Sequence, residues 1–438
     1  MSPVSQRIRT GGDRHVIPLG QATRAWFLIS LQTFGGPAGQ IAVMQRTLVD
    51  DKRWLGERRF LHALSYCMLL PGPEAQQLAI YTGWLLNGWA GGVIAGFLFV
   101  LPGMLALLVL SWVYVTQGDN VLVEAMFLGL APAVLAIVVQ AVVRVGGRVL
   151  RHRALWLIAL ASFVALAAFS VPFPLVILAA GGVGWLLGRW RPAVMVPPSP
   201  AEDDDGPAPL ISDDALHRAT PSALRNLAVL VGGIVVWLLP VLVAYLLTDR
   251  DSVFVQMGVF FSGTALVTFG GAYAVLAFVA QKAVESYGWL TAGEMVHGLA
   301  LAESTPGPLI MVLQFVAFLG AYRDPGSLDP MAAAVIASLL VTWVTFVPSF
   351  LFIFLGAPYV ERLRENRTLA AALTGVTAAV VGVIANLAVF FGVHTLGEWR
   401  SAVIAPIAFA LVFWLKWPML RVLAVCALLG VAVGLLTL

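Results

Sequence analysis

Two Pro-Gly-Pro triplets, Pro71-Gly72-Pro73 and Pro306-Gly307-Pro308, are the residues of this sequence best placed to meet a charged ligand. Proline removes a backbone donor, and it is accepted in the first turn of a following helix. Each triplet is therefore expected to end one half-helix and begin another inside an apolar layer, where broken backbone is tolerated only beside protein or a cavity. The start of the second half-helix offers free N–H groups and a positive dipole end, which suit an anion. The alternative is a proline kink without a ligand.

Polar and ionisable residues accompany the triplets. Glu74 follows the first triplet and Glu303 precedes the second, and ionisable groups in apolar segments are costly enough to be functional candidates. A carboxylate beside an anion must be protonated to avoid repulsion, so both are candidates for proton coupling. A capping acid is the alternative for Glu74, and an interfacial residue is the alternative for Glu303.

Further candidates are hydroxyl, amide and imidazole groups near the triplets. The candidate donors to an anion are Ser304, Thr305, Gln76, Gln77 and Gln314. For the glutamines, hydrogen bonding between helices is the alternative. His62 and His297 are candidates for carrying protons, with buried structural histidines as the alternative.

An internal repeat organises these residues. Phe34-Gly35-Gly36 recurs as Phe269-Gly270-Gly271, and the Pro-Gly-Pro triplets and the two histidines recur at the same offset along the chain. After an insertion around 323–330 the offset becomes longer, and this second offset relates Gly129 to Gly375. The Phe-Gly-Gly glycines permit tight turns or close backbone approach, and helix packing through small residues is the other interpretation.

The pattern predicts an N-terminal tail, two repeats and a connection between them. The predicted divisions are 1–23 for the tail, 24–188 for the first repeat, 189–226 for a hydrophilic linker, 227–253 for a linking transmembrane helix and 254–438 for the second repeat.

Composition makes this a membrane protein. The chain is 60% hydrophobic and 11% charged, whereas soluble domains carry about 25% charged residues. Apolar segments of about 20 residues recur without the alternation of a β-barrel, which predicts an all-α polytopic fold. The expected segments are 24–48, 60–86, 90–116, 122–143, 154–170, 173–188, 227–248, 254–280, 296–320, 331–357, 369–393, 400–415 and 418–437.

Two repeats of six segments each would begin and end on the same side of the membrane. One additional helix between them would therefore invert the second repeat, an architecture that recurs in secondary transporters. Segments 24–48 and 60–86 have glycine- and proline-broken centres, and the sequence leaves open whether they cross the membrane or form re-entrant hairpins. Hairpins place more Lys and Arg on the cytoplasmic side, as the positive-inside rule prefers. The N-terminus and the linker are then cytoplasmic, and no cleavable signal peptide is expected.

Several classes of function are excluded. The net charge of +3 comes from basic residues at segment ends, so a nucleic-acid partner is not expected. Cys67 and Cys426 lie in separate apolar segments and predict neither a disulfide framework nor a metal site. A nucleotide-binding GxxxxGK[ST] motif is absent, and neither a cofactor nor an enzymatic activity is expected.

The stretches FGGPAGQIAVM (34–44), LLPGPEAQQLAIYTGWL (69–85), TFGGAYAVL (268–276) and ESTPGPLIMVLQFVAFLGAY (303–322) resemble the long-chain chromate ion transporter (CHR) family. The resemblance covers essentially the whole chain, and it implies export of chromate across a bacterial inner membrane and chromate resistance. The Phe-Gly-Gly and Pro-Gly-Pro residues match the family's motifs, whereas His62 and His297 lie outside them. Chromate and the lipid bilayer are the implied partners. Sulfate as the substrate, and a homodimer, are alternatives that the sequence leaves open.

Overall fold

The computed structural model describes residues 16–118, 120–190, 210–211, 222–269, 271–357 and 367–436, and these residues are almost entirely helical. The all-α prediction is confirmed. Gly270, the tail up to residue 15 and most of the predicted linker lie outside the described residues.

Short broken helices and long helices alternate in the first half. Its elements are α1 (Leu19–Ser30), α2 (Gly36–Gln45), η1 (Arg46–Asp51), α3 (Glu57–Cys67), α4 (Glu74–Gln117), α5 (Val121–Val149), α6 (Arg153–Ala167) and α7 (Phe173–Trp190). α1 follows Pro18 and therefore begins before the predicted start of the repeat at 24.

A long helix, α9 (Ala223–Leu247), precedes the second half. The elements that follow are α10 (Val253–Val267), α11 (Ala272–Gln281), η2 (Lys282–Ser286), α12 (Ala292–Ser304), η3 (Leu309–Met311), α13 (Val312–Arg323), α14 (Pro330–Gly356), α16 (Arg367–Leu396), α17 (Trp399–Phe409), η5 (Ala410–Trp414) and α18 (Met419–Leu436).

The two halves repeat the same order of helices. The starts of α3 and α12 are related by the shorter offset of the repeat, and those of α5 and α16, α6 and α17, and α7 and α18 are related by the longer one. α4 corresponds to η3, α13 and α14 together, because Asn87 and Gly88 leave the helical conformation and divide α4 where the second half has a loop. The insertion between α13 and α14 accounts for the change of offset.

Seven helices in the described part of the chain are long and apolar enough to cross a membrane: α4, α5, α7, α9, α14, α16 and α18. Four shorter apolar stretches, Arg153–Ala167, Val253–Val267, Leu309–Arg323 and Trp399–Trp414, accompany them. The apolar segments predicted at 24–48 and 60–86 are each broken at their glycine and proline centres. The first contains α1 and α2, and the second contains α3 and the part of α4 before the bend at Asn87.

The two halves contact each other through two equivalent pairs of helices. α5 packs on α18, and α16, the equivalent of α5, packs on α7, the equivalent of α18. Gly129 meets the backbone of Cys426 and Gly430, and Gly184 meets Gly375 in the equivalent contact. Glycine allows two helix backbones to approach this closely. Contacts that repeat when the two halves are exchanged indicate a two-fold relation between them.

The relative direction of equivalent helices can be seen for α5 and α16, which are in contact. Gly146 of α5 faces Val381 of α16, and Leu135 faces Gly392. Because the residue number rises along α5 as it falls along the facing α16, these equivalent helices run antiparallel.

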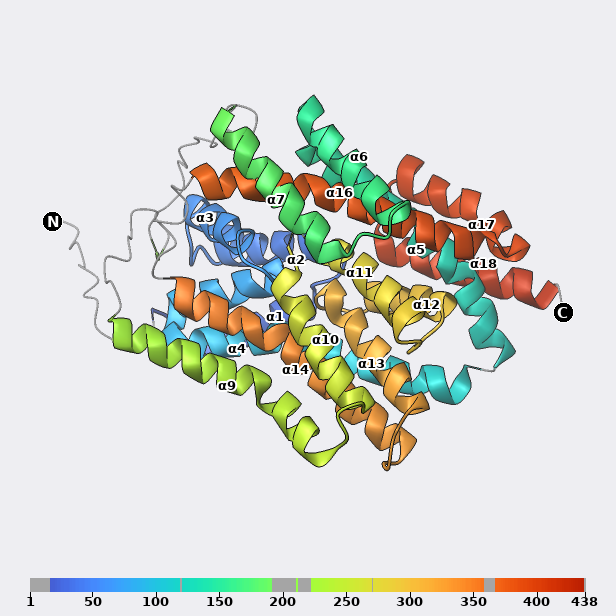
Figure 1. The fold of residues 1–438 in the computed structure, drawn as a ribbon, viewed down its shortest axis with the longest axis horizontal. Helices are drawn as coiled ribbons and strands as arrows, with labels where there is room; N and C mark the ends of the chain where they lie inside the picture. The colour runs from blue at the N-terminus through green and yellow to red at the C-terminus, as the bar shows by residue number, and fades with distance from the viewer. Residues whose placement is uncertain are drawn as a thin grey trace.

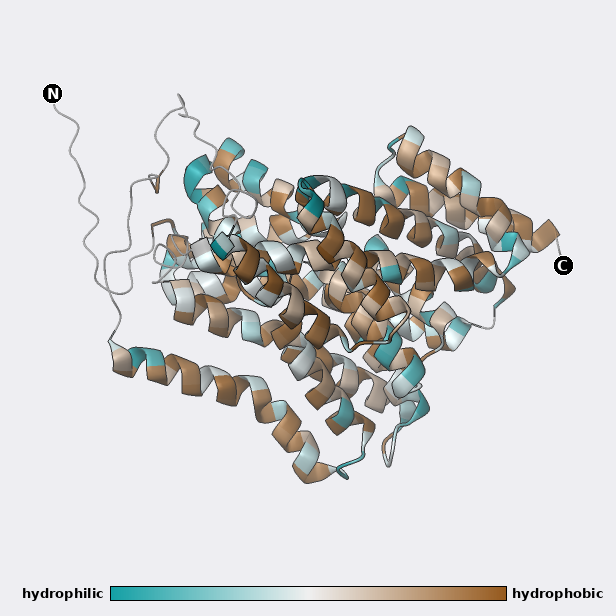
Figure 2. Cartoon of the chain, turned by 45° about the horizontal axis from the view of Figure 1, so that its top comes forward, coloured by the Kyte–Doolittle hydropathy of each residue, from teal (hydrophilic) through white to brown (hydrophobic). Residues whose placement is uncertain are grey.

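α9 lies at the edge of the molecule (Figure 1), where it packs on α10 and α14. Most of its surface is apolar and exposed, and in Figure 2 it forms a largely brown arm beside the helical body. Two tryptophans fix it to α14: Trp237 Nε1 donates to the carbonyl of Val344, and Trp343 Nε1 donates to the carbonyl of Val236.

Candidate functional site

Each Pro-Gly-Pro break is hydrogen-bonded to the opposite half of the chain. The N–H of Gly72 donates to the carbonyl of Thr268 at 2.8 Å, and the N–H of Gly307 donates to the carbonyl of Thr33 at 3.0 Å. The two threonines are themselves equivalent residues of the repeat and directly precede Phe34 and Phe269. The breaks and the Phe-Gly-Gly loops therefore form one crossing in the interior, with its buried backbone groups paired across the two halves.

Glycine is required at the centre of both breaks. Gly72 has a φ of +124° and Gly307 a φ of +107°, a conformation that side-chain-bearing residues rarely adopt. A Cβ on Gly307 would lie 3.3 Å from the Cα of Gly103, because the second break passes directly over α4. In the Phe-Gly-Gly loops, Gly35 and Gly271 also have positive φ values, of +87° and +104°.

Four helices begin at this crossing: α2, α4, α11 and the η3–α13 helix. The hydrogen bond from Gly72 to Thr268 joins the start of α4 to that of α11, and the bond from Gly307 to Thr33 joins the start of η3 to that of α2. η3 also contacts α11, which links the two pairs. None of the four N-cap residues, which are Gly35, Pro73, Gly271 and Pro308, has a side-chain cap.

The starts of α1, α3 and α17 also lack a side-chain cap, but their N-cap residues belong to neither the breaks nor the Phe-Gly-Gly motifs. α5, α9, α10, α12 and α14 start with a side chain that accepts a hydrogen bond from the first turn. The four uncapped starts at the crossing leave first-turn N–H groups and positive dipole ends without a side-chain partner, which suits an anion. The Pro-Gly-Pro triplets predicted two of these starts, and the structure adds those of α2 and α11.

Gln40 and Gln77 hold the breaks in place. Gln40 Nε2 donates to the carbonyl of Gly307 at 2.5 Å, and Gln77 Nε2 donates to the carbonyl of Pro71 at 2.6 Å. Gln40 belongs to the FGGPAGQ stretch, but reasoning from spacing did not single it out, because its partner lies 267 residues away. The signal that the sequence offers is a polar amide side chain inside an apolar, glycine-rich motif.

The other predicted donors bond to backbone carbonyls. Gln76 Nε2 donates weakly, at 3.5 Å, to Phe346 O, and Gln314 Nε2 donates to Met104 O at 2.9 Å, so both amides join α4 to the second half. The hydroxyls of Ser304 and Thr305 donate to the last carbonyls of α12. In this conformation their protons cap the helix end.

Glu303 is buried beside the second break. Its Oε1 accepts a hydrogen bond of 2.6 Å from the hydroxyl of Tyr273, and its Oε2 has no hydrogen-bond partner among the described residues. The first half has Ala38 and Met68 at the equivalent positions, so this polar pair exists on one side of the crossing only. Glu74 lies half-buried in the first turn of α4.

Comparison with known proteins decides the family. A family model described as chromate transporter matches residues 20–185 and 255–431, which are the two halves of the repeat. The chain belongs to the chromate transporter family. It is therefore a multi-pass membrane transporter and not an enzyme.

Relatives cover most of this chromate transporter chain. A chromate transport protein of Pseudomonas aeruginosa is 35% identical over 81% of this chain and 76% of its own length. A chromate transport protein of Cupriavidus metallidurans is 28% identical over 95% of this chain and 94% of its own. An uncharacterised transporter of Methanocaldococcus jannaschii is 24% identical over 92% of this chain and 91% of its own. No solved structure matches.

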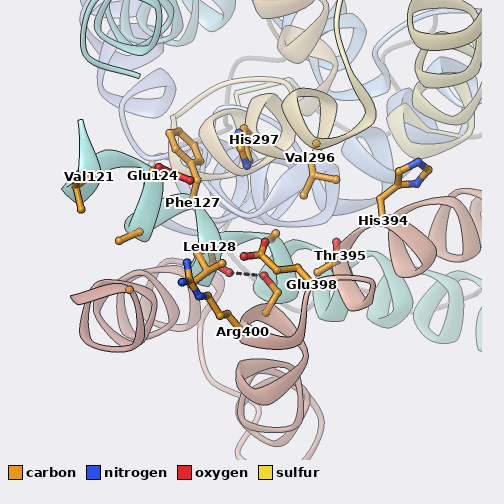
Figure 3. A pocket seen from close by; sticks show the side chains of 15 residues that line it. Val121, Glu124, Phe127, Leu128, Val296, His297, His394, Thr395, Glu398 and Arg400 are labelled. Carbon is orange, nitrogen blue, oxygen red and sulfur yellow. Dashed lines mark hydrogen bonds between the residues drawn. The ribbon is translucent and has the colours of Figure 1, made fainter. Parts of the chain in front are cut away.

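The two predicted histidines of this chromate transporter lie outside the crossing. His297 is stacked on Phe127 and hydrogen-bonded to Tyr114 at 3.1 Å. It lines a cavity of about 300 Å³ formed where α5 and α17 begin and α16 ends, together with Glu124, Glu398 and other residues drawn in Figure 3. His62 is half-buried on α3, and no residue of α3 lines this cavity.

Cys67 and Cys426 are both buried and unpaired with each other. Within the described ranges, no group of three or more His, Cys, Asp and Glu side chains is arranged to hold a metal ion.

Proposed function

We propose that this protein exports chromate from the cytoplasm across a bacterial inner membrane and so confers chromate resistance. The observation that carries the proposal is the crossing of Gly72 and Gly307 with the opposite halves, which gathers four uncapped helix starts in the interior. Such starts bind anions without a buried lysine or arginine. The substrate is taken from relatives that are named chromate transport proteins.

The central site consists of the two Phe-Gly-Gly loops and the two Pro-Gly-Pro breaks. The polar side chains that hold or border it are Gln76, Gln77, Ser304, Thr305 and Gln314. With Gln40 and Gln77 bonded to carbonyls of the breaks, the backbone that meets the anion is held before the anion arrives.

The two halves have opposite orientations in the membrane. The antiparallel packing of α5 and α16 supports this, because equivalent helices that both cross the membrane then cross in opposite directions. The linking helix α9 supplies the odd crossing. The N-terminus and the linker are cytoplasmic. α1 and α2 form one re-entrant hairpin, and α3 forms another with the part of α4 that precedes the bend at Asn87.

Labelling from the two sides tests this topology. Lys52 is exposed between the two hairpins of the first half. A Lys52→Cys variant, made in a chain that lacks both buried cysteines, should react with a membrane-impermeant maleimide only from the cytoplasmic side. Reaction only from the outside contradicts the hairpins.

The membrane potential is a sufficient driving force. Chromate is mainly a dianion near neutral pH, and a dianion leaving a negative cytoplasm gains about 4.6 kcal/mol per 100 mV. This corresponds to about three decades of concentration.

Glu303 couples protons to this movement by exchanging a proton when the anion binds or leaves. Its burial and its unpartnered Oε2 support this role. Glu303→Gln is then expected to remove the dependence of transport on the pH gradient while the response to membrane potential remains. Tyr273→Phe is the matched control, because it removes the partner hydroxyl and keeps the carboxylate. Unchanged pH-gradient dependence in Glu303→Gln contradicts the coupling. Glu74 and the two histidines are the remaining candidates for proton coupling, and the same assay ranks their variants.

Everted membrane vesicles test the function as a whole. We expect chromate uptake above the empty-vector level, with ionophores that collapse potential or pH gradient separating the two driving forces. Sulfate is the competitor, because it shares the charge and shape of chromate. Robust sulfate transport without chromate transport overturns the substrate and keeps the site, whereas transport of neither anion overturns the proposal.

A further inference from the structure

A cavity of about 600 Å³ opens beside the first Phe-Gly-Gly loop, between α5 and the turn from α17 to α18. Phe34 and Gly35 line it together with Gln140, Arg144, Lys416 and Trp417. The lining contains two basic side chains and no acidic one. Its charge therefore favours an anion.

Arg144 is held at this cavity by a chain of hydrogen bonds. Its Nη2 donates to Gln140 Oε1 at 2.8 Å, and Gln140 Nε2 donates to the carbonyl of Val412 at 3.4 Å. Gln140 thus joins α5 to η5 and holds the guanidinium group of Arg144 at the cavity. Lys416 follows η5 with a φ of +51°, and the N–H of Trp417 donates to the carbonyl of Leu411 at 3.0 Å, which fixes the turn that carries Lys416.

The cavity adjoins the central crossing. Phe34 lines it, and the preceding residue, Thr33, accepts the hydrogen bond from Gly307. An anion held at Arg144 is therefore next to the backbone that the central site uses.

The repeat shows that these charges are not a general feature of the fold. The residue equivalent to Arg144 is Phe390, and the residue equivalent to Lys416 is Ser170. Ser170 retains the same turn, with a φ of +49°. The backbone is thus repeated in both halves, while the cations are present in one half only.

We propose that this cavity is the cytoplasmic receiving site for a divalent tetrahedral oxyanion, which Arg144 and Lys416 hold before it enters the central site. The proposal rests on the proposed function, in which the end of α5 that carries Arg144 faces the cytoplasm. The neutral counterpart, with Phe390 and Ser170, then lies toward the outside. A cationic entry and a neutral exit favour capture inside and release outside.

The kinetics of chromate uptake into everted vesicles test the site. Arg144→Gln and Lys416→Gln should each raise KM about tenfold, as expected when a dianion loses one neighbouring unit charge, and should leave Vmax nearly unchanged. Arg144→Lys should restore most of the affinity. The matched control is Arg148→Gln, one helical turn further along α5, because Arg148 is exposed and is not part of the cavity lining.

The amount of each variant inserted in the membrane distinguishes a role of Arg144 and Lys416 in anion binding from a role in topology or lipid contact. If the Arg144 and Lys416 variants lower the amount inserted but keep the wild-type KM, the receiving site is wrong. The same conclusion follows if Arg148→Gln raises KM equally.

Binding to the purified protein separates this proposal from the function. Titration calorimetry with chromate, and with sulfate, should show affinity that falls about tenfold in Arg144→Gln. If wild-type vesicles transport chromate but neither KM nor this affinity changes in the variants, the receiving site is refuted and the function stands. If wild-type vesicles transport neither anion, the function fails, and an Arg144-dependent affinity still supports an anion site in this cavity.

Discussion

Replacing Gly307 by alanine tests whether the interlocked break holds the centre of the protein together. Gly307 has a φ of +107°, and a residue with a side chain costs about 1–3 kcal/mol in such a conformation. The new Cβ would lie 3.3 Å from the Cα of Gly103, which is closer than an ordinary contact. Because that neighbour is backbone, the break itself must move, and overpacking of this kind costs about 1–3 kcal/mol.

Movement of the break also weakens its hydrogen bonds. Gly307 donates to the carbonyl of Thr33 and accepts from Gln40, and each bond contributes about 1 kcal/mol. The combined cost is about 2–8 kcal/mol, a large part of the roughly 5–15 kcal/mol that stabilises a typical domain. Because the same bonds place the helix starts, transport should fall by more than tenfold.

The assay compares Gly307→Ala with Gly147→Ala by thermal unfolding in detergent and by chromate uptake. Gly147 lies inside α5 without a positive φ, and a Cβ there would meet nothing within 4 Å. Alanine at Gly147 should therefore be neutral or should stabilise α5 by up to about 1 kcal/mol. If the two variants melt and transport alike, neither the left-handed backbone nor the interlock holds the break, and the reasoning is refuted.

Three further predictions concern the contact between the halves, the start of α12 and the ion pair of Glu294. Gly129→Ala places a methyl group against the carbonyl of Cys426, and we expect a loss of about 1–3 kcal/mol in thermal unfolding; an unchanged melting temperature would contradict the glycine contact. Thr291→Ala removes the N-cap of α12 and should cost about 1 kcal/mol, whereas Glu294→Gln retains the capping arrangement, removes the charge paired with Arg323 and should cost less than about 1 kcal/mol. Burial acts to raise the pKa of Glu294, but hydrogen bonds from Arg323 and Thr291 and the charge of Arg323 outweigh it and hold that pKa below its usual value of 4.5. The pair should therefore stabilise the protein above pH 4.5 and lose its effect as the pH falls through the lowered pKa. An acid titration of the melting temperature checks this, and a wild-type curve that coincides with that of Glu294→Gln would count against it.

The sequence by itself determined the class of the protein and its division into halves. Apolar segments, glycine and proline breaks and a repeat are local or periodic signals, so they can be read without knowing which segments touch. The Pro-Gly-Pro triplets indicated broken helices because proline and glycine limit the backbone wherever they occur. The same signals placed the bend at residues 87–88, between the predicted segments 60–86 and 90–116.

Only the tertiary structure decided which groups meet. Gly307 bonds to Thr33 and Gln40, and Tyr273 meets Glu303, because helices from distant parts of the chain pack closely together. Spacing along the chain carries no information about such contacts, since they depend on how the two halves dock. The gathering of four helix starts, and the cavity beside Arg144, follow from that docking, which glycines in both halves permit by allowing helix backbones to touch.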